Sequence, residues 1–134
     1  MADEVKKASF LACSCLHVPF NPPETVDWLL GRLSDLQPDV FVFLGDLFDS
    51  SAVSVHPHEY EHSLELEYEE GADIFSRVMK AIPNSKYVWC LGNHDANIRS
   101  EDPRRSPKQL RSLFDWNNHF VYGKVFRKFK QIPY

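Results

Sequence analysis

The chain has 134 residues, of which 43% are hydrophobic and 25% are charged, a composition that fits one globular domain with its own core. No apolar run approaches the roughly 20 residues that a membrane-spanning helix needs, and the charged N-terminus lacks the apolar stretch of a signal peptide. Three cysteines, an odd number without framework spacing, argue against a disulfide-rich secreted protein and favour a reduced, cytoplasmic setting.

The charge is distributed unevenly along the chain. Residues 1–96 contain 6 Lys and Arg against 16 Asp and Glu, a net charge of −10, whereas residues 97–134 contain 9 against 3, a net charge of +6. A basic segment beside an acidic one would suit an anionic substrate that approaches a metal site. The alternative is that surface helices simply differ in charge, and the sequence leaves both interpretations open.

Three short apolar segments, each followed directly by polar residues, predict three strands. They are Ser9–Cys13, about Val40–Leu44, and Tyr87–Leu91. Between the first two, Asn21-Pro22-Pro23-Glu24 predicts the start of a helix with Asn21 as its cap.

A second helix is expected over about His58–Ala81, and its many acidic residues predict a solvated face. Beyond Asp95 the pattern is looser. A helix near Pro107–Asp115 and a strand-like segment over Val121–Ile132 are expected there.

The alternation of strands and helices predicts the α/β class, with a mainly parallel sheet flanked by helices. The carboxyl ends of parallel strands share one edge of a sheet, and that edge is where open α/β sheets bind ligands. The polar residues after the three strands would therefore converge. Their amide, imidazole and carboxylate groups suit metal and phosphate chemistry.

Three blocks occur at these strand ends in a fixed order: Cys15-Leu16-His17, Gly45-Asp46-Leu47-Phe48-Asp49 and Gly92-Asn93-His94-Asp95. They resemble the opening blocks of the calcineurin-like metallophosphoesterases, Asp-x-His, Gly-Asp-x-x-Asp and Gly-Asn-His-Asp/Glu. The phrase Ser14–Phe20 is similar to phage members of that family. The resemblance implies half of a four-layer α/β/β/α sandwich, and hydrolysis of phosphomono- or diesters by a metal-bound hydroxide. A nucleic acid or a nucleotide is the substrate that the phage-like phrase favours.

The same resemblance implies a role for each matching residue. His17 would ligate a first metal ion, Asp46 would bridge two metal ions, and Asn93 would ligate the second. His94 would face the phosphate as general acid, and Asp49 would orient His94 through a hydrogen bond. The implied cofactors are one or two divalent ions, which would be Mn, Zn or Fe.

Cys15 departs from the family, because it stands where the family has the aspartate of Asp-x-His. A thiolate binds zinc or ferrous iron but is a poor ligand for Mg²⁺ or Mn²⁺. Three interpretations stay open: Cys15 is a soft metal ligand, a small residue that leaves the metal site weakened, or a sporadic loss of a ligand. Cys13 and Cys90 are expected to be buried thiols, and Asp95 is either part of the site or a cap of the next segment.

The second departure concerns histidine ligands, since no Gly-His pair follows Asp95 and His119 is the only later histidine. His119 is either a substitute ligand or a structural residue. Residues 1–134 are therefore expected to form a single but incomplete domain, the N-terminal portion of the fold. One sheet face would then be apolar and exposed, with Phe10, Phe41, Phe43 and Val88 as candidates, so self-association or a complementing polypeptide is expected.

The leading functional prediction is a metal-dependent phosphoesterase that is impaired or needs a complementing half. The alternative is a non-catalytic remnant or interaction module, one piece of a split enzyme. A third, weaker hypothesis is nucleic-acid binding through residues 97–134, whose mark would be a steep salt dependence.

Overall fold

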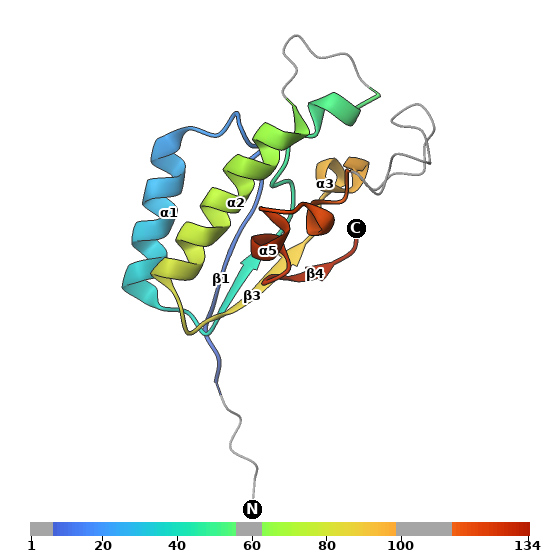
Figure 1. Ribbon diagram of the computed structural model, residues 1–134. Helices are drawn as coiled ribbons and strands as arrows, with labels where there is room; N and C mark the ends of the chain where they lie inside the picture. Colours follow the sequence, from blue (N-terminus) through green and yellow to red (C-terminus); the bar gives the residue numbers. More distant parts are fainter. Residues whose placement is uncertain (1–6, 56–62, 99–113) are drawn as a thin grey trace, which may run out of the picture.

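A sheet of four parallel strands lies at the centre of the computed structural model, which describes residues 7–55, 63–98 and 114–134 (Figure 1). The strands are β1 (Phe10–Cys13), β2 (Val40–Phe43), β3 (Lys86–Cys90) and β4 (Lys130–Ile132). They pair in the order β1-β2-β3-β4. The predicted α/β class with a parallel sheet is confirmed.

The helices lie on one face of this sheet because each new strand is added on the same side as the last. Crossovers between parallel strands are right-handed, so a steady progression across the sheet keeps every connecting helix on the same side. Figure 1 shows α1 (Pro23–Leu36), α2 (Leu64–Ala81) and α5 (Gly123–Phe126) together on that side.

The core fills the space between this covered face and the helices. Phe41, Phe43 and Trp89 point from the strands into the core and are at most 1% exposed. Phe75 of α2 meets them: its ring centroid lies 5.7 Å from that of Phe43 and 5.3 Å from that of Trp89, and it stacks on Phe129 at 3.9 Å. Aromatic packing therefore joins β2, β3 and the segment before β4 to the same helix.

The opposite face of the sheet is uncovered and largely apolar. Phe10 is 73% exposed and Ile132 is 43% exposed, and Val40, Val42 and Val88 are only half-buried. The expectation of an exposed apolar face is confirmed for Phe10 and Val88. It is wrong for Phe41 and Phe43, because successive strand residues point to opposite faces and these two alternate with the exposed set.

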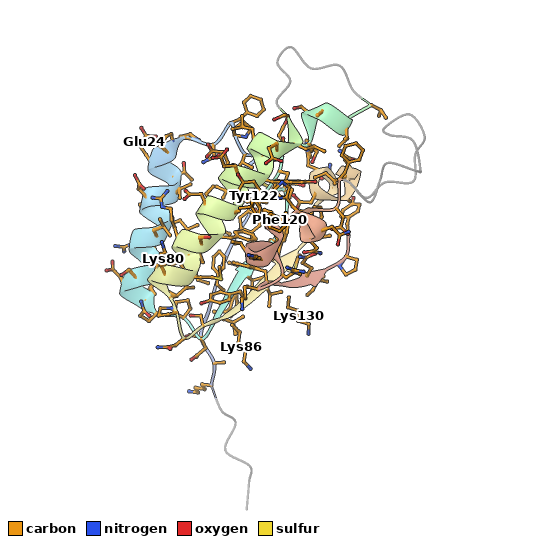
Figure 2. The ribbon with its side chains drawn as sticks, in the orientation of Figure 1. Glu24, Lys80, Lys86, Phe120, Tyr122 and Lys130 are labelled. Atoms are coloured by element: carbon orange, nitrogen blue, oxygen red, sulfur yellow. The ribbon has the colours of Figure 1, made fainter. Side chains whose placement is uncertain are left out.

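Lysines mark one border of this face. Figure 2 shows Lys86 and Lys130 at the end of the sheet that lies away from α3 (Asn93–Ile98). Both side chains are exposed. These two cations are therefore not among the residues that line the carboxyl ends of the strands.

The helix starts differ from the predicted ones. Helix α1 begins at Pro23 after Pro22, with no side-chain cap, so Asn21 is not the cap. Helix α2 begins at Leu64, because Ser63 has an extended backbone and its hydroxyl accepts the N–H of Leu66. The earlier part of that predicted helix, through residue 62, lies outside the described residues.

The C-terminal prediction also needs correction. Val121–Ile132 is not one strand: a short helix, α5, comes first and only Lys130–Ile132 is extended. The helix predicted near Pro107–Asp115 lies almost wholly outside the described residues. Among the helices that the structure describes, none has the length and apolar character needed to cross a membrane.

Loss of a phenylalanine side chain should affect stability differently on the covered and the uncovered face of the sheet. We expect Phe41→Ala to lower the free energy of unfolding by about 3–5 kcal/mol, because it opens a cavity under the helices. We expect Phe10→Ala, on the uncovered face, to change it by less than about 1 kcal/mol. Urea unfolding of the two variants measures the difference, and equal losses would show that Phe10 is covered in solution.

Candidate metal and catalytic site

The loops that follow β1 and β2 run side by side at the carboxyl edge of the sheet. The N–H of Cys15 donates to the carbonyl of Gly45 at 2.9 Å, and the N–H of His17 donates to the carbonyl of Asp46 at 3.0 Å. The N–H of Val18 continues the pattern by donating to the carbonyl of Leu47 at 2.8 Å. These bonds extend the parallel pairing past the strand ends and place the first two motifs together.

Three candidate site residues have left-handed backbone conformations. The φ angles are 61° at Cys15, 48° at His17 and 57° at Asp46. For a residue with a Cβ this conformation costs roughly 1–2 kcal/mol, and such strain gathers at functional sites. The inter-loop hydrogen bonds hold the three residues in it.

Gly45 and Gly92 allow the loops after β2 and β3 to approach closely. A Cβ on Gly45 would lie 2.6 Å from the backbone nitrogen of Gly92, and Gly45 also has a φ of +109°. A Cβ on Gly92 would overlap the carboxylate of Asp46. The glycines are therefore needed for the contact between the second and third motifs.

Asp95 ties these loops together through a buried carboxylate. Its Oδ2 accepts the N–H of Asp46 at 2.8 Å and that of Gly92 at 2.9 Å, and its Oδ1 accepts the N–H of Phe48 at 3.0 Å. Burial raises the pKa of Asp95 to about 6, against the lowering effect of the three N–H donors. Asp95 therefore holds two motifs in place, a wider role than capping the segment that follows it.

The first two motifs bring three possible metal donors together. A ligand atom from each of Cys15, His17 and Asp46 lies within 4.8 Å of the others. A thiol, an imidazole and a carboxylate form a donor set that suits zinc or ferrous iron. Asn93 is the exposed first residue of α3, directly after Gly92.

His94 is held at two points. Its backbone N–H donates to Oδ1 of Asp46 at 2.9 Å, and its ring Nδ1 lies 2.7 Å from the backbone carbonyl oxygen of Asp49. A carbonyl oxygen can only accept a hydrogen bond, so this contact requires the proton on Nδ1. The contact with Asp49 therefore leaves Nε2 as the ring nitrogen available to other partners.

The carboxylate of Asp49 makes longer contacts. Its Oδ1 is 3.9 Å from Nδ1 of His94 and 3.6 Å from Nδ1 of His17. The rings of His17 and His94 meet edge to face, with centroids 4.6 Å apart. His17, Asp49 and His94 thus form a second group whose ligand atoms lie within 4.8 Å of one another. Asp49 bonds to His94 through its main chain rather than its side chain.

Glu67 is a buried acidic residue that the sequence prediction missed. Its side chain is 0% exposed, and Oε1 accepts the N–H of Ser50 at 2.7 Å. Burial raises its pKa to about 8. The prediction of a solvated acidic face is therefore wrong at this position. Its spacing from Leu64 and Gly71 already placed Glu67 on the packed side of α2.

His119 is held away from a ligand role by its own contacts. Its Nε2 lies 2.8 Å from Oε2 of Glu65, and its Nδ1 accepts the N–H groups of Val121 and Tyr122 at 3.2 Å each. With both ring nitrogens engaged, His119 stabilises the turn before α5. The substitute-ligand interpretation is not supported.

The remaining cysteines lie outside both donor groups. Cys13 and Cys90 are free and half-buried. Burial raises the pKa of the Cys13 thiol to about 12, so it stays protonated near neutral pH. The interpretation of Cys13 as a buried thiol is consistent with this environment.

These features define a candidate metal site: strained loops at the edge of a parallel sheet, with possible metal donors beside a histidine held in one tautomer. The chain matches the model of the calcineurin-like phosphoesterase family over residues 8–132, and it belongs to this family. The family supports metal-dependent action on phosphate esters. Comparison with curated proteins finds no match.

Removal of the Asp95 charge should loosen two motifs at once. We expect Asp95→Asn to lower the free energy of unfolding by roughly 3 kcal/mol, because an amide cannot accept all three N–H groups and leaves buried donors unsatisfied. The exposed Asp73→Asn is the matched control and should change it by less than about 1 kcal/mol. Urea unfolding compares them, and a neutral Asp95→Asn would contradict the tie between the loops.

Proposed function

We propose that this protein hydrolyses phosphate monoesters or diesters in the cytoplasm, with one or two divalent metal ions held at the carboxyl edge of its sheet. The observation that carries the proposal is the convergence of Cys15, His17 and Asp46 within 4.8 Å, beside a histidine in a fixed tautomer. Membership of the calcineurin-like phosphoesterases supports the reaction class. The resemblance to phage members favours a nucleotide or a nucleic acid as substrate.

The metal ligands in this proposal come from all three motifs. Cys15, His17 and Asp46 hold the first ion, and Asp46 and Asn93 contribute to the second. When bound, divalent ions offset charge on the phosphate and make a water nucleophilic near neutral pH. The chain's contribution is to hold Cys15, His17 and Asp46 in their left-handed backbone conformations before any ion arrives.

His94 acts as the general acid in this proposal. Because Nδ1 donates its proton to the carbonyl of Asp49, the acid form is the imidazolium, which carries a second proton on Nε2 and gives that proton to the departing ester oxygen. The bond from the His94 backbone to the Asp46 carboxylate ties the acid to a metal ligand. Proton donor and metal donors therefore keep a fixed relation to one another.

Cys15 is the ligand that sets metal choice in this proposal. Cys15 is the exposed member of the first donor group, whereas His17 and Asp46 are half-buried. Its thiolate favours zinc or ferrous iron over manganese. A carboxylate at the same position would lower the preference for zinc over manganese.

Metal binding and hydrolysis test this assignment together. We expect the wild-type protein to bind Zn²⁺ more tightly than Mn²⁺, and Cys15→Asp to narrow that difference by weakening Zn²⁺ binding more than Mn²⁺ binding. Asp46→Asn should slow hydrolysis of an aryl phosphate ester by on the order of 100-fold or more, since it removes several kcal/mol of charge stabilisation. Titration calorimetry and a colorimetric assay make the measurements.

The exposed Asp35→Asn is the control and should leave both metal binding and hydrolysis unchanged. If the wild-type protein binds neither ion at micromolar concentration, autonomous catalysis is excluded. The chain would then act as a non-catalytic module.

We also propose that a further polypeptide covers the exposed face of the sheet and supplies histidine donors to the site. Two features support a further polypeptide as the partner of this face. The uncovered face carries Phe10, Val42 and Val88 on strands that lead directly into the site. Within the described residues, the two donor groups contain only His17 and His94 as histidines.

Free imidazole can stand in for the missing donors. We expect millimolar imidazole to tighten Zn²⁺ binding and to raise the rate of hydrolysis, because it fills open coordination positions. Sedimentation velocity of the chain alone should show a monomer. No response to imidazole would contradict a shortage of histidines, and a dimer that Val42→Glu dissociates would assign the face to a second copy of this chain.

A further inference from the structure

Glu67 occupies a position that its charge makes costly. It lies on α2, facing the sheet, and its side chain is 0% exposed. Of its two oxygens, Oε1 accepts the N–H of Ser50 at 2.7 Å, and Oε2 is buried without a hydrogen-bond partner among the described residues. A buried carboxyl group costs several kcal/mol unless its surroundings compensate, so an acidic residue here needs a reason.

The N–H that Glu67 holds belongs to the same peptide unit as the carbonyl that holds His94. Glu67 accepts the N–H of Ser50, and the carbonyl of that peptide, from Asp49, accepts the Nδ1 proton of His94 at 2.7 Å. A trans peptide is planar, with its N–H and C=O pointing in opposite directions. To fix the direction of the N–H is therefore to fix the direction of the C=O.

The two hydrogen bonds on this peptide, from Ser50 N–H to Glu67 and from His94 Nδ1 to the Asp49 carbonyl, also strengthen one another. A carboxyl oxygen that accepts a peptide N–H polarises that peptide and makes its carbonyl a stronger acceptor. Glu67 thus strengthens, as well as aims, the acceptor for Nδ1 of His94. The left-handed backbone of Ser50, with a φ of 60°, shows that this peptide is held in a conformation that an L-residue rarely adopts unaided.

The Asp49 side chain is the obvious competitor for this role. Its Oδ1 is 3.9 Å from Nδ1 of His94, beyond hydrogen-bonding distance, whereas the Asp49 carbonyl is 2.7 Å away. The histidine is therefore oriented by the peptide that Glu67 holds and not by the neighbouring carboxylate.

We propose that Glu67 is a positioning residue for His94, acting through the single peptide unit between Asp49 and Ser50. It holds the ring by its Nδ1 proton, so that the neutral form is the Nδ1–H tautomer and Nε2 is always the nitrogen that gains the catalytic proton and gives it to the leaving group. The catalytic part of this inference rests on the proposed phosphoesterase function. The tautomer itself does not depend on catalysis.

The tautomer of His94 can be read from the nitrogen-15 chemical shifts of its ring in NMR spectra of the purified protein, with and without added Zn²⁺. The wild-type protein should show a protonated Nδ1. Glu67→Ala should shift His94 to a mixture of tautomers and speed amide hydrogen exchange at Ser50 by about tenfold, as expected for loss of one hydrogen bond. The exposed Glu70→Ala, on the same helix, is the matched control and should change neither quantity.

Two conservative variants keep the test decisive if Glu67→Ala does not fold. Glu67→Gln retains an acceptor oxygen at the same reach and should keep the wild-type tautomer. Glu67→Asp retains the carboxyl group but withdraws it by one methylene, and it should lose the tautomer. A single wild-type tautomer in both Glu67→Ala and Glu67→Asp would overturn the proposal, as would its loss in Asp49→Asn, because that result would assign the role to the Asp49 side chain.

Kinetics provide the catalytic readout. We expect Glu67→Asp to lower kcat for an aryl phosphate ester by about tenfold, with KM and Zn²⁺ affinity unchanged, and Glu67→Gln to restore the rate. Loss of Zn²⁺ affinity together with kcat would show a general structural defect and overturn the positioning role. If the wild-type protein has no hydrolytic activity, the proposed function fails, and the His94 tautomer still decides the role of Glu67.

Discussion

The carboxylate of Asp95 is the contact on which the site depends. It accepts N–H groups from Asp46, Phe48 and Gly92, which belong to the loops after two neighbouring strands. Those loops can meet only because Gly45 and Gly92 lack a Cβ. With the loops joined, the Asp46 carboxylate accepts the N–H of His94. This hydrogen bond connects a candidate metal ligand directly to the candidate general acid.

A second constraint comes from the order of the strands. The sheet grows in one direction, β1-β2-β3-β4, and right-handed crossovers then send α1, α2 and α5 to one face. The aromatic core forms on that face and holds the strands in register. The opposite face keeps its apolar residues exposed, and it lies on the same strands that end in the site. The exposed face and the candidate site are therefore carried by the same strands.

The two acidic residues that face inwards have related tasks. Asp95 fixes the backbone of the second and third motifs, and Glu67 holds the peptide that bonds to the His94 ring. Each is surrounded by backbone N–H donors, although burial still raises the pKa of both. Neither belongs to the first donor group of Cys15, His17 and Asp46. The chain thus separates the groups that would touch substrate or metal from those that keep them in place.

The sequence by itself determined the local features: three apolar strands, the glycines after two of them, and the metal-competent residues at their ends. Periodicity and motif order carry that information, because each depends only on near neighbours in the chain. The burial of Phe41 and Phe43, the contacts of His119, and the roles of Asp95 and Glu67 depended on contacts between residues far apart in sequence. Glu67 was concealed within an acidic run: its helical spacing from Leu64 and Gly71 was a hint in the sequence, and the packing of α2 decided its burial. Tertiary structure decided these points because burial and hydrogen-bond partners depend on which helices, strands and loops pack against each other. The pattern of residues along the chain does not specify that packing.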